Sequence, residues 1–340
     1  MADEIKNRCK NCAGELKYDP ISGELKCTHC NTIVDIPEQQ ALVQKRAFSS
    51  TSQTSEAMAN TVQYKCLNCG GRHNVTNGEE IGRCPNCGSS DLEQKSLVTY
   101  QPDGIVPFKL DKEKAMESFR EWLKKRKFAP NNLKRLAKSQ KMTGMYIPVY
   151  SYDFDYTAQY SGTGVNTKRV GDQEIKTKHR FNETENGTMT DFLSSANTTF
   201  EGEKLRDMGN FGLEQLYVYR TEFLYGWSGM DCTENIQNNY NKTRVEVSAD
   251  ISKRIEQRMS RKYDRVENFS CNTSLRNIKF SYLYLPVWVN HYKYNKKDYY
   301  CYINGCTGKV TGKSPKSFWK IFFTVLVIVA AVGAYIYFSS

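Results

Sequence analysis

The longest apolar stretch of the chain lies near its C-terminal end. Residues 321–338 contain no charged side chain, and as a helix they would span about 27 Å, close to the thickness of a bilayer core. Trp319 stands before this stretch, and Tyr335 and Tyr337 lie at its far end, as in the aromatic belts of membrane helices. A buried core helix is the alternative, but such a helix is seldom apolar on every face. The pattern predicts a transmembrane anchor over residues 316–340.

Positive charge flanks this anchor on one side. Only two serines follow it in the sequence. The lysines that precede it are Lys309, Lys313, Lys316 and Lys320. Because basic flanks stay in the cytoplasm, we expect a single-pass protein of the cell membrane whose N-terminal 320 residues face the cytoplasm.

Residues 97–315 show a strand-like pattern interrupted by helices. The stretch 144–156 alternates strongly and is rich in tyrosine, which is typical of a strand. One amphipathic helix is expected over about residues 111–127 and another over about 247–265. Further strands are expected near residues 178–181, 215–227, 279–294 and 299–303. With 22 Tyr and 16 Phe in the chain, the pattern predicts an α+β domain built on an antiparallel, aromatic-rich sheet.

The N-terminal part has few apolar residues and contains the same cysteine motif twice. Each copy has two C-x-x-C pairs separated by fourteen residues, and the second copy lies 57 residues after the first. This is the spacing of a four-cysteine zinc site. The expected ligands are Cys9, Cys12, Cys27 and Cys30 in the first copy and Cys66, Cys69, Cys84 and Cys87 in the second.

We therefore expect two zinc ribbons, each holding one structural zinc ion. Four thiolates fill a tetrahedral site and leave no position for water, so catalysis at the metal is not expected. Such a small unit has little core, and the metal supplies most of its folding free energy. Disulfides are the alternative, but the charged residues 1–10 are not a signal peptide. A redox-active C-x-x-C would need a thioredoxin-like βαβ pattern, which is not seen.

The stretch between the two cysteine sets is rich in Gln, Ser, Thr and Ala, and its apolar residues are sparse. We expect a flexible linker that lets the ribbons move independently. The predicted divisions are ribbon 1 at 1–36, the linker at 37–61, ribbon 2 at 62–96, the α+β domain at 97–315 and the transmembrane anchor at 316–340.

Charge divides the chain unevenly. The formal net charge is +11, yet residues 1–95 hold eleven basic and twelve acidic residues. The densest positive segment is 109–141, with twelve basic and four acidic residues. A solvated helix face, contact with anionic lipid and nucleic-acid binding are all compatible with it. The candidate contacts to a polyanion are Lys124, Lys125, Arg126, Lys127, Lys134 and Arg135.

Motifs for catalysis are not found. The stretch 308–314 is one residue short of a phosphate-binding loop and runs toward the apolar anchor. The four histidines show no metal-ligand spacing, and there is no G-x-S-x-G. We expect that the protein is not an enzyme.

The order of motifs resembles a known bacterial family. After two ribbons come Gly144-Met-Tyr-Ile-Pro148, then Leu285-Pro-Val-Trp288, then Asn304-Gly-Cys-Thr-Gly-Lys309. This series is similar to the TFIIB-type zinc-ribbon-containing proteins, which are often labelled primosomal replication-restart helicases through their ribbons. Members usually have Gln at the place of Cys306. The resemblance implies two zinc sites, a β-rich domain and a location near the membrane.

Three functions follow as hypotheses. The first is a membrane-anchored, non-enzymatic adaptor whose zinc ribbons bind a protein partner. The alternative is a nucleic-acid-binding protein of DNA replication or repair, which would use the basic helices at 109–141. The third is a small-molecule site in the β domain, lined by some of its many tyrosines.

Overall fold

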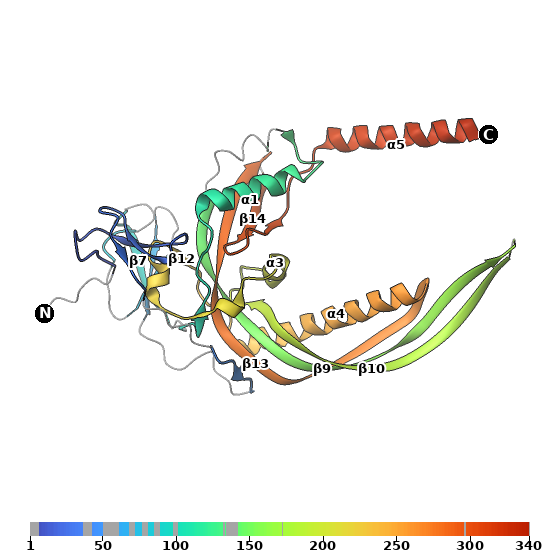
Figure 1. Ribbon diagram of the computed structural model, residues 1–340, viewed down its shortest axis with the longest axis horizontal. Helices are drawn as coiled ribbons and strands as arrows, with labels where there is room; N and C mark the ends of the chain where they lie inside the picture. The colour runs from blue at the N-terminus through green and yellow to red at the C-terminus, as the bar shows by residue number, and fades with distance from the viewer. Residues whose placement is uncertain are drawn as a thin grey trace.

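The protein has a body, a long curved arm and a projecting C-terminal helix (Figure 1). The computed structural model describes residues 7–36, 43–49, 61–67, 72–76, 81–84, 89–97, 101–131, 133, 142–171, 173–295 and 297–339. The architecture is α+β, as the sequence predicts, with a large antiparallel sheet that is rich in aromatic side chains.

The large sheet forms both the body and the arm. Its main strands run in the order β10-β9-β13-β14-β15, and every neighbouring pair on this path is antiparallel. They are β9 (Met142–Val170), β10 (Gln173–Ser195), β13 (Arg265–Tyr294), β14 (Lys297–Asn304) and β15 (Val310–Gly312). The short strands at its margins are β4 (Arg46–Ala47), β8 (Gly104–Ile105), β11 (Tyr217–Val218) and β12 (Ser228–Gly229).

The arm consists of the far halves of β9, β10 and β13. Helix α4 (Ile236–Lys262) lies along the concave side of this three-stranded ribbon (Figure 1). Val247, Ile251, Ile255 and Met259 are buried at intervals of four residues, so one narrow stripe of the helix covers the sheet. The end of the β9–β10 hairpin projects beyond α4 (Figure 1).

Three β-bulges accompany the curvature of the arm. The register shifts between Met189 and Phe192 in β10, and twice in β13. Each irregularity contains one residue with a positive φ: Asp191 (53°), Asn268 (53°) and Asn277 (50°). Asp and Asn tolerate the left-handed region better than other residues with a Cβ. Bulges bend and twist a strand, so these residues help to set the curve of the ribbon.

The body is packed around aromatic side chains. Phe108 stacks on Trp227 at a centroid distance of 4.1 Å and meets Tyr146 and Trp288 edge-on at 5.1 and 5.4 Å. Helix α1 (Lys112–Lys124) covers this end of the sheet through Phe119 and Leu123, both almost fully buried. Asp111 caps the helix by accepting a hydrogen bond from the amide of Lys114 at 2.8 Å.

Several expectations for the middle of the chain need correction. The expected strand over residues 215–227 is instead the 3-10 turns η1 (Leu213–Gln215) and η2 (Thr221–Leu224) with β11 between them. Gly212 and Gly226 bracket this stretch with positive φ, which breaks extended structure. A short helix, α3 (Gly202–Asp207), was not predicted. Helix α4 begins about eleven residues before the predicted start because Asn235 caps it there.

Part of the expected flexible linker is a strand of the sheet. Residues 46–47 form β4, which pairs with β13. Lys45 donates to Asp153 and Asp191 at 2.5 and 2.6 Å, and Phe48 packs on Tyr240. The prediction of a flexible linker is therefore wrong for residues 43–49, because strand pairing, the contacts of Lys45 and Phe48, and the ion pair of Arg46 with Asp103 attach the segment to the body.

Helix α5 (Phe318–Ser339) leaves the body at its first turn (Figure 1). The span Phe318–Phe338 has a mean hydropathy of 2.5 and is not buried by the rest of the chain. It is therefore long and apolar enough to cross a membrane. Its start is attached to the body: the Ser317 amide donates to the Phe128 carbonyl at 2.8 Å, and Lys320 Nζ donates to the Ala129 carbonyl at 2.7 Å.

Candidate metal centre

The first cysteine quartet lies on a small three-stranded sheet. Strands β1 (Leu16–Asp19), β2 (Glu24–Cys27) and β3 (Ile33–Val34) form it in the order β1-β2-β3. The two C-x-x-C turns stand at one end of this sheet. Each turn needs a residue in the left-handed region, and Ala13 (φ 56°) and Asn31 (φ 57°) occupy these positions.

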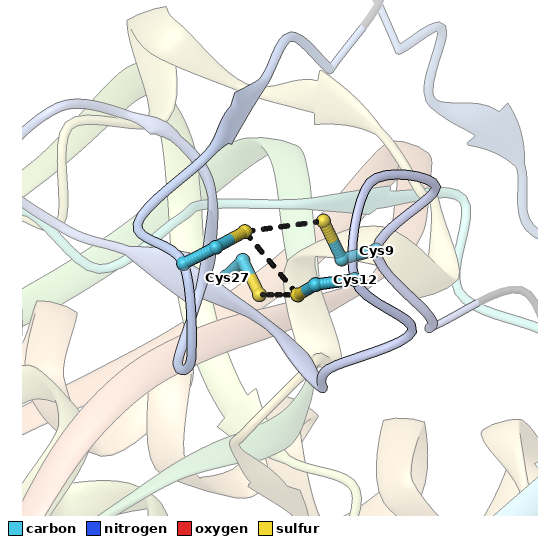
Figure 2. Close-up of side chains that lie close together, drawn as sticks. Cys9, Cys12 and Cys27 are labelled. Atoms are coloured by element: carbon cyan, nitrogen blue, oxygen red, sulfur yellow. Dashed lines mark hydrogen bonds between the residues drawn. The ribbon is translucent and has the colours of Figure 1, made fainter.

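The four sulfur atoms of this quartet converge on one point. All four lie within 4.8 Å of one another. Cys12 Sγ is 3.5 Å from Cys27 Sγ and 3.3 Å from Cys30 Sγ, and Cys9 Sγ is 3.6 Å from Cys30 Sγ. Figure 2 shows the side chains of Cys9, Cys12 and Cys27 directed toward one another. Sulfur ligands of a tetrahedral zinc ion, each about 2.3 Å from the metal, stand about 3.8 Å apart. The quartet could hold one metal ion, and its all-thiol chemistry favours zinc.

Glycine is needed beside this quartet. A Cβ at Gly14 would lie 2.9 Å from the Cβ of His29, 3.0 Å from Cys27 Sγ and 3.2 Å from Cys12 Sγ. The carbonyl of Gly14 also accepts a hydrogen bond of 2.8 Å from the Cys9 amide, which closes the first turn. The two turns can therefore approach each other only because residue 14 has no side chain.

Hydrogen bonds favour a thiolate within the quartet. The hydroxyl of Thr32, 2.9 Å from Cys30 Sγ, and then the Thr32 amide lower the pKa of Cys30 to about 6. At Cys12 the amide of Gly14 lowers the pKa, but the sulfur contacts, led by Cys30, and burial outweigh it and raise the pKa to about 12. Neighbouring thiolates repel each other, so full ionisation of the quartet calls for a cation between them. The spacing of the cysteines gave no signal for Thr32.

The first ribbon is attached to the body. The Tyr18 amide donates to the Tyr225 carbonyl at 2.9 Å, and Trp227 Nε1 donates to the Tyr18 carbonyl at 3.2 Å. The Tyr18 hydroxyl reaches the Phe108 carbonyl at 3.3 Å, and its ring meets Phe223 edge-on at 5.4 Å. The expectation that this ribbon moves independently is therefore wrong: one buried tyrosine joins it to two segments of the body.

A cavity of about 600 Å³ lies between the first ribbon and the body. Its walls include Tyr18, Phe223, Arg220 and the carboxylates of Glu24 and Asp35. Burial, followed by the neighbouring Asp35, raises the pKa of Glu24.

The second quartet is described only in part. Its strands are β5 (Thr61–Cys66), β6 (Arg72–Thr76) and β7 (Leu92–Leu97), paired in the order β6-β5-β7. Cys66 and Cys84 are buried, at 0% and 2% exposure. Cys69 and Cys87 lie outside the described residues. The second zinc ion therefore stays a prediction.

The predicted polyanion contacts fall into two groups. Lys124, Lys125, Arg126 and Lys127 are exposed at the end of α1. Lys134 and Arg135 lie outside the described residues.

Comparisons with known proteins gave one distant relative. No family model matches the chain, and no solved structure matches it. Among curated proteins, it is similar to Uncharacterized protein YdjG of Bacillus subtilis (strain 168), with 26% identity over 325 residues. The alignment covers 93% of this chain and 92% of that protein. The chain thus has a distant homologue that matches it over nearly its whole length.

Proposed function

We propose that the protein is a membrane-anchored adaptor that binds a protein partner through its zinc ribbons and performs no catalysis. Each ribbon would hold one structural zinc ion, the second through Cys66, Cys69, Cys84 and Cys87. The protein would be held in the cell membrane by α5, with its N-terminal bulk in the cytoplasm. The TFIIB-type zinc-ribbon family that the motif order resembles fits this design.

The orientation of the first ribbon carries the proposal. Its Tyr18 end is fixed to the body, while the opposite end presents the two cysteine turns outward. The exposed residues on these turns are Lys10, Asn11, Thr28 and His29. Rigid turns that are held at a fixed angle lose little conformational entropy when a partner binds.

The chemistry of the quartet supports a binding role. Four thiolates complete a tetrahedral shell, so a bound zinc ion would have no position for water or substrate. The metal would fix the shape of the two turns and add negative charge to this end of the protein. A partner with a basic surface fits that charge best.

Capture of partners from native membranes by in-cell crosslinking tests this proposal. One variant replaces the four exposed turn residues Lys10, Asn11, Thr28 and His29 by alanine and keeps every cysteine. The control variant carries Ile21→Ser, an exposed position in the turn between β1 and β2, away from the cysteine turns. Loss of a crosslinked partner in the first variant alone supports the adaptor function. Capture that survives deletion of residues 1–95 overturns it.

A further inference from the structure

Positive charge is not spread evenly along α1. The first three turns of the helix carry Lys112, Lys114 and Arg120 together with three glutamates. From Trp122 to Asn131 the chain has four basic residues and no acidic one. The basic segment, Lys124, Lys125, Arg126 and Lys127, is exposed throughout. The charge of this helix is therefore concentrated at one end.

That end of α1 is the place where α5 begins. The Ser317 amide donates to the Phe128 carbonyl at 2.8 Å. Lys320 Nζ donates to the Ala129 carbonyl at 2.7 Å and to Asn131 Oδ1 at 2.8 Å. These bonds fix the basic segment within a few residues of the first apolar turn of the anchor. The lysines on the approach to α5 are Lys313, Lys316 and Lys320, and no acidic residue lies among them.

Aromatic side chains accompany this charge. Phe128 is 39% exposed and Trp319 is 65% exposed. Arg126 lies over the ring of Trp122 at 4.6 Å, so its guanidinium is held at the surface by a cation–π contact. Amphipathic and aromatic side chains beside a membrane helix suit the headgroup region of a bilayer.

The basic segment has no charged partner among the described residues: none of the ion pairs formed there involves Lys124, Lys125, Arg126 or Lys127. We propose that the basic segment 124–127 and the lysines before α5 form a binding surface for the headgroups of anionic phospholipids. The surface fixes how the body stands on the membrane. A basic residue held near an anionic leaflet is stabilised by the negative surface potential of the lipids.

The position of the basic segment favours lipid over nucleic acid as its ligand. When α5 spans a bilayer, its first turn lies at the headgroup level, and the hydrogen bonds to Phe128 and Ala129 bring the basic segment to the same level. A nucleic acid would then compete with lipid phosphates at the surface of the leaflet. The proposal therefore rests on the membrane anchorage by α5 that is part of the proposed function, but not on the binding of a partner by the ribbons.

Lysine acetylation of the full-length chain in nanodiscs tests the proposal. The discs contain phosphatidylcholine alone or phosphatidylcholine and phosphatidylglycerol in equal parts, and mass spectrometry follows each lysine. We expect Lys124, Lys125 and Lys127 to react about fivefold more slowly in the anionic discs, the equivalent of ~1 kcal/mol. Lys112 and Lys114 on the same helix serve as internal controls, and their acetylation rates should differ by less than about twofold between the two kinds of disc. Salt at about 1 M should remove the difference, since it shortens the screening length to about 3 Å.

Two results would overturn the proposal. One is an equal slowing of all lysines, or no slowing, in anionic discs. The other is protection of Lys124, Lys125 and Lys127 by added DNA in phosphatidylcholine discs that exceeds the protection by anionic lipid, which would favour nucleic acid.

A pair of variants adds a second measurement. The Lys124→Gln, Lys125→Gln, Lys127→Gln variant should lose the lipid-dependent protection of Lys313 and Lys316. The matched Lys112→Gln, Lys114→Gln, Arg120→Gln variant removes the same charge and should retain it. Loss in both variants would contradict a surface located at this end of α1.

Discussion

Replacing Gly144 by alanine should disturb the zinc ribbon from inside the sheet. Gly144 lies on β9 beneath the ring of Trp227. A Cβ at this position would clash with Trp227 Cζ3 and would lie 2.7 Å from Trp227 Cε3 and 3.2 Å from Phe108 Cζ. The indole is rigid and is stacked on Phe108 at 4.1 Å, so it cannot yield by rotating a flexible end. It must move as a whole, or the strand must move away from it.

The expected loss of stability has two parts, the overpacking around the Trp227 indole and the weakening of its hydrogen bond. Overpacking a tight core costs about 1–3 kcal/mol. Displacing Trp227 also weakens its hydrogen bond to the Tyr18 carbonyl, which contributes about 0.5–1.5 kcal/mol. We expect Gly144→Ala to lower the free energy of unfolding by about 2–4 kcal/mol. Zinc should also leave the first ribbon faster, because Tyr18 attaches that ribbon to the body.

The assay is urea unfolding of the zinc-loaded chain in nanodiscs, followed by tryptophan fluorescence, together with zinc transfer to a chelator. Gly229→Ala is the matched control: it lies on β12, beside β9, and its Cβ would stand 3.6 Å from the Tyr284 hydroxyl in ordinary contact. We expect this control to lower the free energy of unfolding by less than about 0.5 kcal/mol.

A second change tests the cause directly. Trp227→Phe removes the ring atoms that the new Cβ would strike. The Gly144→Ala, Trp227→Phe double variant should therefore lose less stability than the two single losses added together, by about 1 kcal/mol or more. A loss below about 0.5 kcal/mol for Gly144→Ala, or strict additivity in the double variant, would refute the steric reasoning.

Three further predictions concern the metal site, the β4 attachment and the arm. Cys12→Ser should leave the chain with one zinc ion fewer, measured by elemental analysis, and equal zinc in both chains would contradict a metal in this quartet. Lys45→Met should lower the free energy of unfolding by about 1–2 kcal/mol, since it leaves two adjacent carboxylates without their cation; the exposed Lys26→Met is its control, and an equal loss there would exclude this cause. A hydrogen bond from Arg258, supported by one from Tyr156, lowers the pKa of Glu185 below its ordinary 4.5. This pair therefore stabilises the arm fully above that value and loses its effect as the pH falls through the lowered pKa. Hydrogen exchange of α4 should rise over that acidic range and should depend less on pH in Glu185→Gln; an unchanged pH profile would show that the pair is not responsible.

The sequence predicts those features whose signals are local. The first cysteine quartet follows from spacing alone, because four sulfurs on two turns can satisfy one ion. The apolar helix α5 follows from composition. The antiparallel aromatic sheet follows from alternation in stretches such as 144–156. In each case neighbouring residues carry the whole signal.

The length of the arm and the attachment of the first ribbon to the body could not be predicted from local sequence patterns. Strands such as Met142–Val170 continue far past the aromatic alternation into residues rich in Thr, Asn and Lys, where α4 covers one face of the ribbon. The contact between Tyr18 and Trp227 joins residues 209 positions apart. Polar strands and distant contacts depend on the tertiary structure, which no local pattern encodes.

The construction of the arm restricts how its length can evolve. One residue added to β9 alone would turn every later side chain to the opposite face, so tolerated insertions come in even numbers and in β9, β10 and β13 together. Two residues lengthen a strand by about 6.7 Å, which α4 matches with about four or five residues. Relatives should therefore differ in arm length by discrete, concerted steps. A gap of one residue in this region of an alignment should mark a bulge gained or lost, as at Asn268 or Asn277.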